Sequence, residues 1–240
     1  MPNNDLAQTI ASAVIAASNP AKAQAMMRFF KTGPGQYGEG DQFLGLTAPI
    51  MRQLAKRYRD CPPEEACRLL ASPWHEVRSC ALLLLVNSYA AAGDDDARRE
   101  RIYRLYLQHT ARINNWDLVD ISAPGIVGEH LLTRDRTPLS ALAASAWLWD
   151  QRIAMIATLT FIRAGEFADT LRLVEQLLSH QHDLMHKAMG WMLREVGKRD
   201  RDTLSAFLRK HQHALPRTTL RYAIEHYPAA ERQRFLQGRH

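Results

Sequence analysis

The chain has 240 residues, of which 46% are apolar and 23% are charged, enough apolar material for the core of one large domain or two small ones. Its 3 cysteines are too few and too irregularly spaced for a disulfide framework or a cysteine-type zinc site. No run approaches the roughly 20 apolar residues of a membrane span. We therefore expect reduced thiols, a cytoplasmic protein and no membrane partner.

The formal net charge of +6 is unevenly distributed along the chain. Residues 1–193 hold 20 basic and 20 acidic side chains, whereas residues 194–240 hold 11 and 5. A basic segment of this kind favours a polyanion such as nucleic acid, because counterions are released on binding. A solvated surface that only keeps the protein soluble is an equally good interpretation of the charge alone.

Apolar residues recur at steps of three and four along the chain, as in Leu6, Ile10 and Val14. This spacing predicts helices, whereas no alternating run typical of a strand is present. The N-terminal segment lacks a basic region before its apolar residues, so we expect no signal peptide. Residues 31–45 (KTGPGQYGEGDQFLG) are the one long irregular piece and are predicted to form an ordered loop.

Proline and glycine mark the predicted helix boundaries. Pro73, Pro138 and Pro216 stand where helices can begin. Helix breaks are predicted at four glycines, Gly93, Gly125, Gly165 and Gly197. The pattern indicates roughly ten to twelve helices with no linker, and a single domain over residues 1–240.

A weak repeat runs through these helices. Its copies begin at Trp74, Trp116 and Trp149, and a fourth relative spans residues 183–196. Spacings of about 42 and 33 residues are those of HEAT-type helix pairs, in which one helix of each pair lines a concave face. Aligning the copies gives one shared position, occupied by Arg78, Asp120, Arg152 and Lys187. We expect this position at the groove-facing start of the inner helices, in an all-α, HEAT-like curved solenoid with a concave basic groove.

Trp116 and Asp120 are four residues apart and therefore share one face of a helix. A carboxylate is also electrostatically favoured near a helix N-terminus. If the copies stack, Arg152 and Trp191 from neighbouring repeats lie beside them, and the groove holds a carboxylate between two indoles and a guanidinium. The alternative is that Asp117 or Asp120 caps a helix while the tryptophans fill the core.

The order and spacing of several segments resemble the DNA alkylation repair (AlkD-like) family of HEAT-like-repeat alkylpurine DNA glycosylases. The matching segments are FLGLTAPIMRQLAK (43–56), NNWDLVDISAP (114–124), WDQRIAMIATLTFIR (149–163), HKAMGWMLREVGK (186–198) and LPRTTLRYAIEHY (215–227). The resemblance implies excision of positively charged N3- and N7-alkylated purines, such as 3-methyladenine and 7-methylguanine, from double-stranded DNA. The chain departs from many relatives at Asn115, where they carry an aromatic residue, and in its longer glycine-rich loop (33–40), which leaves the substrate range open.

The resemblance also implies the roles of single residues. Asp120 corresponds to the catalytic acid and Arg152 to the arginine at the catalytic cleft, while Trp116 and Trp191 correspond to the aromatic residues that flank the lesion. The residues predicted to contact the DNA are Trp116, Trp191, Lys187 and Arg194. We expect the protein in the bacterial cytosol or nucleoid, as a monomer without an obligate protein partner.

The chemistry of this reaction fits these residue types. An alkylated purine already carries positive charge, so the departing base needs no general acid, and a fixed carboxylate stabilises the sugar as it becomes cationic. Indole faces can contact the cationic nucleotide, and a guanidinium matches phosphate oxygens. No lysine in the matched motifs is an obvious Schiff-base nucleophile, so we expect a monofunctional hydrolase that leaves an abasic site. The resemblance implies that the lesion is handled from the backbone side, without a base-reading pocket.

Other motifs favour no cofactor and no metal. His180, His182 and His186 could ligate zinc, but a helix-start loop with surface imidazoles is the favoured interpretation. The GPGQYGEG segment lacks the Lys-Ser/Thr ending of a phosphate-binding loop, so it either touches DNA phosphates through its amides or covers a helix end. The competing function is a non-catalytic helical-repeat DNA-binding or scaffolding protein, which would need the basic surface but not Asp120.

Overall fold

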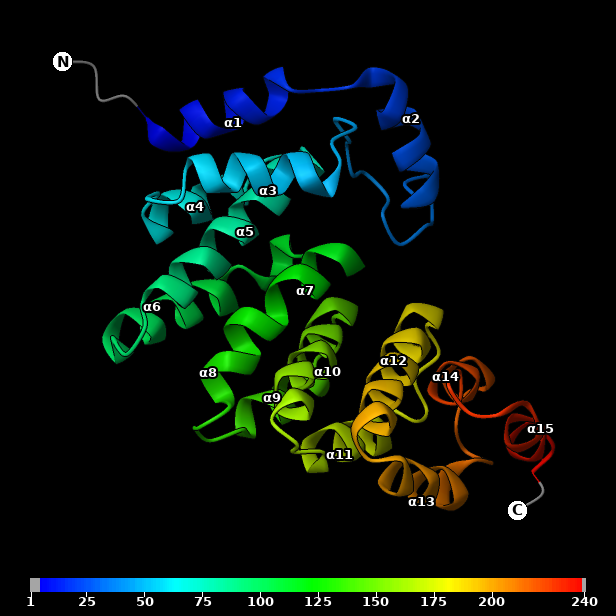
Figure 1. The fold of residues 1–240 in the computed structure, drawn as a ribbon. Coiled ribbons are helices and arrows are strands. Elements are labelled where there is room, and N and C mark those ends of the chain that lie inside the picture. The colour runs from blue at the N-terminus through cyan, green and yellow to red at the C-terminus, as the bar shows by residue number, and fades with distance from the viewer. Residues whose placement is uncertain (1–4, 239–240) are drawn as a thin grey trace. The chain divides into compact units, whose positions relative to one another are not determined.

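The computed structural model describes residues 5–238, and most of them are helical (Figure 1). The strand-like pairing in this range is limited to a parallel bridge between Gln42 and Trp74, so the predicted all-α fold is confirmed. Between residues 5 and 238 no helix combines the length and the apolar character needed to cross a membrane. All 3 cysteines are buried and free of disulfide bonds.

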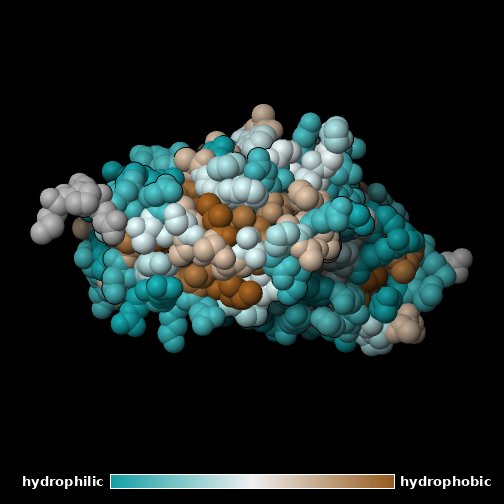
Figure 2. Space-filling model, turned by 90° about the horizontal axis from the view of Figure 1, so that it is seen from above, coloured by the Kyte–Doolittle hydropathy of each residue, from teal (hydrophilic) through white to brown (hydrophobic). Residues whose placement is uncertain are grey.

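The chain divides into two compact units, residues 1–126 and 127–240. The expectation of one domain over residues 1–240 stays a prediction. Figure 2 shows that hydrophilic residues cover most of the face seen there, while hydrophobic residues gather near its centre. The large apolar side chains that stay exposed include Ile15, Phe29, Ile50 and Trp147.

The first unit is built around one long helix. Its elements are α1 (Leu6–Ala16), α2 (Pro20–Phe29), α3 (Ala48–Arg57), α4 (Pro63–Leu69), α5 (His75–Ala91), α6 (Asp96–Gln108), a 3-10 turn (Thr110–Arg112) and α7 (Trp116–Ala123). Helices α1, α3, α4, α6 and α7 all pack against α5. Because α5 is covered on so many sides, its side chains are buried along most of its length.

The second unit stacks its helices in two rows. Its elements are α8 (Glu129–Leu131), α9 (Thr137–Ala143), α10 (Leu148–Arg163), α11 (Ala168–Gln176), α12 (Asp183–Arg199), α13 (Arg201–His211), α14 (Arg217–Ala223) and α15 (Ala229–Gln237). Helix α12 packs between α10 and α14, while α9 and α11 pack on α10 and α13 packs on α12 (Figure 1). This packing is consistent with the helix-pair repeat that the sequence predicts, and the curved solenoid with a concave basic groove stays a prediction.

Each of the four repeat copies begins a helix, namely α5, α7, α10 and α12. The position shared by the copies lies close to the start of every one of these helices, as predicted. Its expected exposure to a groove is wrong for Arg78 and Arg152, which are 2% and 5% exposed. The guanidinium of Arg78 is buried because it donates to the carboxylate of Asp41 at 2.5 Å.

Three of the four predicted glycine breaks are confirmed and one is wrong. Gly93 and Gly165 follow α5 and α10 with φ of +53° and +84°, a conformation that favours glycine. Gly125 lies in the π turn that separates α7 from α8, whereas Gly197 lies inside α12. A Cβ at Gly125 would come within 3.1 Å of the Val86 side chain, and one at Gly197 would collide with Leu204. These glycines therefore lie where neighbouring helices pack closely.

The helical elements of residues 5–238 outnumber the predicted ten to twelve, since their labels run to α15. One reason is that Pro124 interrupts a longer helical segment. Proline has no backbone N–H to donate, and the π turn over residues 124–128 separates α7 from the 3-residue α8. Several helices thus contain too few residues for their apolar spacing to be recognised in the sequence.

Candidate functional site

Helix α7 carries Trp116 and Asp120 and has a well-defined start. Asn115 is the N-cap residue, and its side-chain oxygen accepts a hydrogen bond from the backbone N–H of Trp116 at 2.9 Å. Asp117 accepts one from the N–H of Leu118 at 2.9 Å. Asp117 is therefore bound to the helix start, where a carboxylate is favoured by the helix dipole. Asp120 stands one turn after Trp116, and both side chains are half-buried, so neither is sealed in the core.

The indole of Trp116 rests on an aromatic cluster from α2 and the following loop. Its ring stacks on Phe30 with 5.3 Å between centroids and meets the edge of Phe29 at 6.0 Å. Its Nε1 donates to the hydroxyl of Tyr37 at 3.3 Å. Phe29 is 66% exposed, so it extends the aromatic surface of Trp116 toward solvent. Sequence analysis missed Phe29 and Tyr37, although the aromatic residues on both sides of the glycine run were an available signal.

The glycine-rich segment forms an ordered strap, residues 31–46, that covers the start of α5. The carboxylate of Glu76 accepts hydrogen bonds from the backbone N–H groups of residues 44–46, at 2.9, 2.8 and 3.1 Å. The N–H of His75 donates to the carbonyl of Gln42 at 2.8 Å. Gly45 has φ of +84°, and a Cβ there would collide with the backbone of α2, so only glycine fits. These contacts come from residues 42–46, and both interpretations of residues 33–40, covering a helix end and touching DNA, stay predictions.

Buried charges lie beneath the strap. His75 contacts two carboxylates, with its Nδ1 3.1 Å from Asp41 and its Nε2 2.7 Å from Asp117. Asp41 also accepts hydrogen bonds from Arg78 at 2.5 Å and from Asn115 at 3.2 Å. Each charged side chain in this set thus has a partner, as buried charges require, although the Nε of Arg78 forms no hydrogen bond. Sequence analysis did not single out this set, whose one local signal is the charged HEVR stretch at the start of an otherwise apolar helix.

The pKa values of His75 and Asp41 follow from this arrangement. Burial lowers the pKa of His75, but the carboxylates of Asp117 and Asp41 raise it by more, to about 9. Burial raises the pKa of Asp41, but the His75 and Arg78 charges and hydrogen bonds lower it by more, so it stays below its ordinary value. His75 is therefore a cation at neutral pH, with both ring nitrogens donating.

In the second unit, Arg152 is held against the start of α12. Its side chain is buried, and one guanidinium nitrogen donates to the carbonyl of Leu184 at 2.7 Å. Leu184 lies in the first turn of α12, because that helix begins at Asp183. The fold thus brings Arg152 of α10 to the helix that carries the other predicted residues of this unit.

Lys187, Trp191 and Arg194 follow one another at steps of four and three on α12 and therefore share a face. Lys187 pairs with Asp183 at 2.8 Å, and the Nε1 of Trp191 donates to Glu195 at 3.3 Å. Arg194 forms an ion pair with Glu225 from beyond α14. The Trp191 side chain is half-buried, which leaves part of the indole accessible.

The three histidines around the start of α12 form hydrogen bonds within the turn that leads into the helix. The Nδ1 of His180 accepts from the N–H of His182 at 3.0 Å, and the Nδ1 of His182 accepts from the N–H of Leu184 at 3.2 Å. The Nε2 of His186 lies 2.5 Å from the carbonyl of His180. Burial lowers the pKa of His180 and of His182, which keeps both neutral and able to accept. In the described range no group of three His, Cys, Asp or Glu side chains is arranged to hold a metal ion.

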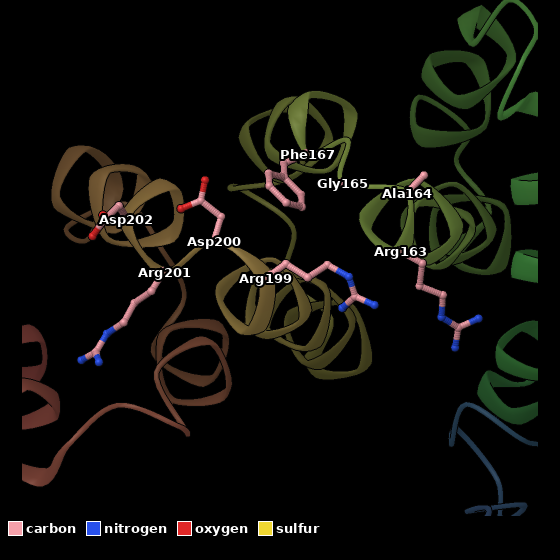
Figure 3. A pocket seen from close by; sticks show the side chains of 8 residues that line it. All are labelled: Arg163, Ala164, Gly165, Phe167, Arg199, Asp200, Arg201 and Asp202. Atoms are coloured by element: carbon pink, nitrogen blue, oxygen red, sulfur yellow. The ribbon is translucent and has the colours of Figure 1, made fainter.

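Basic residues line an open cleft of about 740 Å³ at the ends of α10 and α12. Figure 3 shows the guanidinium groups of Arg163 and Arg199 extending to the same side, away from the carboxylates of Asp200 and Asp202. Arg201, also in the lining, pairs with Glu231 at 2.5 Å. Two neighbouring guanidinium groups of this kind suit a phosphate, since arginine matches phosphate oxygens with paired donors.

The predicted site residues fall into two sets. Trp116 and Asp120 belong to the first unit, and Arg152, Lys187, Trp191 and Arg194 to the second. Each unit places its own residues as described above. The meeting of the two sets in one groove stays a prediction.

Comparison with known proteins gives a family and a fold. A family model described as DNA alkylation repair enzyme matches residues 10–227. Among curated proteins, none matches this sequence. A solved structure, a predicted DNA alkylation repair enzyme from Enterococcus faecalis, is similar over 88% of this chain and 97% of its own, with a TM-score of 0.67 and 17% identity. At that identity the similarity shows a shared fold.

Proposed function

Because the chain belongs to the family of DNA alkylation repair enzymes, we propose that it is a monofunctional DNA glycosylase for positively charged N3- and N7-alkylated purines. It hydrolyses the N-glycosidic bond and leaves an abasic site. The observation that carries the proposal is the arrangement at the start of α7, where the half-buried Trp116 and Asp120 stand one turn apart beside an aromatic cluster. We further propose that it acts on double-stranded DNA as a monomer in the bacterial cytoplasm.

The proposed reaction begins with breakage of the bond between the sugar C1′ and the purine nitrogen. The bonding electrons leave with the base, which is neutralised by them because alkylation had made it cationic. The sugar gains oxocarbenium character, and the carboxylate of Asp120 stabilises that charge. Water then adds to C1′ and loses one proton, which Asp120 can accept while it orients the water. The departing base therefore needs no proton donor. This agrees with the proposed site, whose reacting group is a carboxylate.

The other predicted residues hold the substrate in this proposal. Trp116 and Trp191 contact the cationic nucleotide through their ring faces, each contact being worth about 1–2 kcal/mol. Arg152 is assigned to a phosphate that would reach its buried guanidinium at the start of α12, because a guanidinium offers paired donors. Lys187 and Arg194, on the same face of α12 as Trp191, are assigned to the DNA backbone.

The direct test is release of 7-methylguanine and 3-methyladenine from methylated duplex DNA, with and without a chelator. We expect both bases to be released and the rate to be the same in the two conditions, because one ring nitrogen of each of His180, His182 and His186 is engaged within their own turn. If the protein releases no methylated base, the glycosylase proposal fails. A lower rate in the presence of chelator would support a metal site at His180, His182 and His186.

Phosphate contacts at the cleft of Arg163 and Arg199 predict a change in the salt dependence of DNA binding. The double substitution Arg163→Gln and Arg199→Gln should reduce the slope of log K against log salt by about 2, since each phosphate contact contributes about 0.9. Fluorescence anisotropy with undamaged duplex between about 50 and 200 mM salt measures this slope. Arg104→Gln is the matched control, because Arg104 is an exposed residue of α6 that pairs with Glu100. This variant should leave the slope unchanged. An unchanged slope in the double variant would exclude the cleft from the DNA-binding surface.

A further inference from the structure

His75 joins three separate segments of the first unit. It is the first residue of α5, and it contacts Asp41 in the strap and Asp117 in the first turn of α7. The imidazole is 2% exposed, so water does not substitute for either carboxylate. The strap, α5 and α7 therefore meet at one charged ring.

A column of stacked rings makes a second connection between His75 and Trp116. The imidazole stacks on Phe43 with 4.4 Å between centroids, Phe43 stacks on Phe30 at 4.8 Å, and Phe30 stacks on Trp116 at 5.3 Å. The interplanar angles along the column are 20°, 20° and 17°. A cationic ring over an aromatic face is electrostatically favoured. The indole of Trp116 is thus the last of four rings, and the first of them is charged.

The chain neighbours of Trp116 are held by the same buried groups. Asn115, before it, donates to Asp41 at 3.2 Å, and Asp117, after it, is bound by His75 at 2.7 Å. Buried ion pairs add little net stability, because desolvation offsets much of their attraction. Their best-attested benefit is to specify one arrangement over others. Here the specified arrangement is the first turn of α7.

We propose that His75 is a positioning residue, which holds the first turn of α7 so that the indole of Trp116 and the carboxylate of Asp120 meet the damaged nucleotide in one orientation. This inference rests on the proposed glycosylase function and adds a residue that does not itself touch the substrate. Orientation matters because a displacement of about 1 Å at a reacting group can cost about 100-fold in rate. Without the imidazolium, Asp117 loses its buried partner and Asp41 keeps Arg78 and Asn115.

The charge of His75 makes this role dependent on pH. The titratable groups that face the ring are Asp41 from the strap and Asp117 from α7, while Arg78 on α5 binds Asp41 and Glu76 binds the strap backbone. Against the effect of burial, the two carboxylates raise the pKa of His75 to about 9. A raised pKa means that the stabilisation is complete below pH 6.5, the ordinary value, and is lost as pH rises through about 9. Above that pH the ring keeps one proton and can donate to one carboxylate only.

The test is the single-turnover rate of 7-methylguanine release between about pH 6 and pH 10, with DNA affinity measured in parallel. The rate of the unmodified protein should fall as pH rises through about 9. In His75→Gln the rate at pH 7 should drop by about 10-fold or more, the DNA affinity should stay within about twofold, and the alkaline fall should disappear. In Asp117→Asn the fall should move to lower pH, because the carboxylate that raises the pKa most is gone while an amide oxygen still accepts.

Each outcome of this test either supports or overturns one of the two proposals. Alkaline profiles that coincide in the three proteins, or a rate lowered equally at every pH in both variants, overturn the positioning role and leave the glycosylase function standing. An unmodified protein that releases no base defeats the glycosylase function itself. Thermal unfolding establishes that the variants are folded at the assay temperature. If His75→Gln does not fold, the position of the alkaline fall in Asp117→Asn decides alone.

Discussion

Asp120→Asn is expected to lower the rate of 7-methylguanine release by between about 100-fold and 1,000-fold, the cost typical of removing one group that stabilises transition-state charge. The amide keeps the size and the hydrogen-bonding capacity of the carboxylate and removes its charge. The charge is the part that matters, because the sugar becomes cationic as the base departs. Undamaged duplex DNA carries no such charge at the sugar, so its affinity should remain within about twofold.

This variant separates an enzyme from a binding protein of the same fold. A helical-repeat DNA-binding or scaffolding protein needs its basic residues and has no use for Asp120. The measurement is base release under single-turnover conditions together with anisotropy on the same duplex. Glu129→Gln, which neutralises an exposed carboxylate at the start of α8, is the control and should match the unmodified protein. A rate for Asp120→Asn within about threefold of the unmodified rate would remove Asp120 from the reaction.

Glu76→Ala is expected to lower the free energy of unfolding by at least about 3 kcal/mol, because three buried N–H groups lose their acceptor at once. One carboxylate oxygen accepts from Gly45 and Leu46, and the other accepts from Leu44. The strap depends on these bonds, and Asp41 and Tyr37 belong to the strap. Loss of Glu76 should therefore also weaken the contact between Tyr37 and Trp116.

Urea denaturation followed by circular dichroism measures this effect. The free energy of unfolding of Glu76→Gln should lie between those of the alanine variant and the unmodified protein, because the amide oxygen can still accept a hydrogen bond. The amide NH₂ group faces an N–H donor and cannot pair with it. Glu64→Ala is the matched control on the surface, since Glu64 is paired with Arg101 on exposed side chains, and it should cost less than about 1 kcal/mol. A loss of less than about 1 kcal/mol in Glu76→Ala would show that the strap is held by other contacts.

The helices could be predicted largely from local signals. Apolar residues at steps of three and four, such as Leu6, Ile10 and Val14, identified α1, and the repeat copies located the starts of α5, α10 and α12, because both signals are properties of neighbouring residues. Glycine was a weaker signal, since Gly93 ends a helix through its positive φ whereas Gly197 allows α13 to approach α12. Both roles are filled by the same residue type, so the sequence does not tell them apart. Only the packing partner distinguishes them.

By itself, the sequence determined that the chain is all-α and that Trp116 and Asp120 share one face of a helix start, and it predicts that the helix pairs repeat. These are consequences of spacing along the chain. The tertiary structure decided that His75, a residue of the apolar α5, is a buried cation between Asp41 and Asp117, which are 34 and 42 positions away from it. The reason is physical: burial, charge pairing and pKa depend on which distant groups surround a side chain, and no local pattern records that.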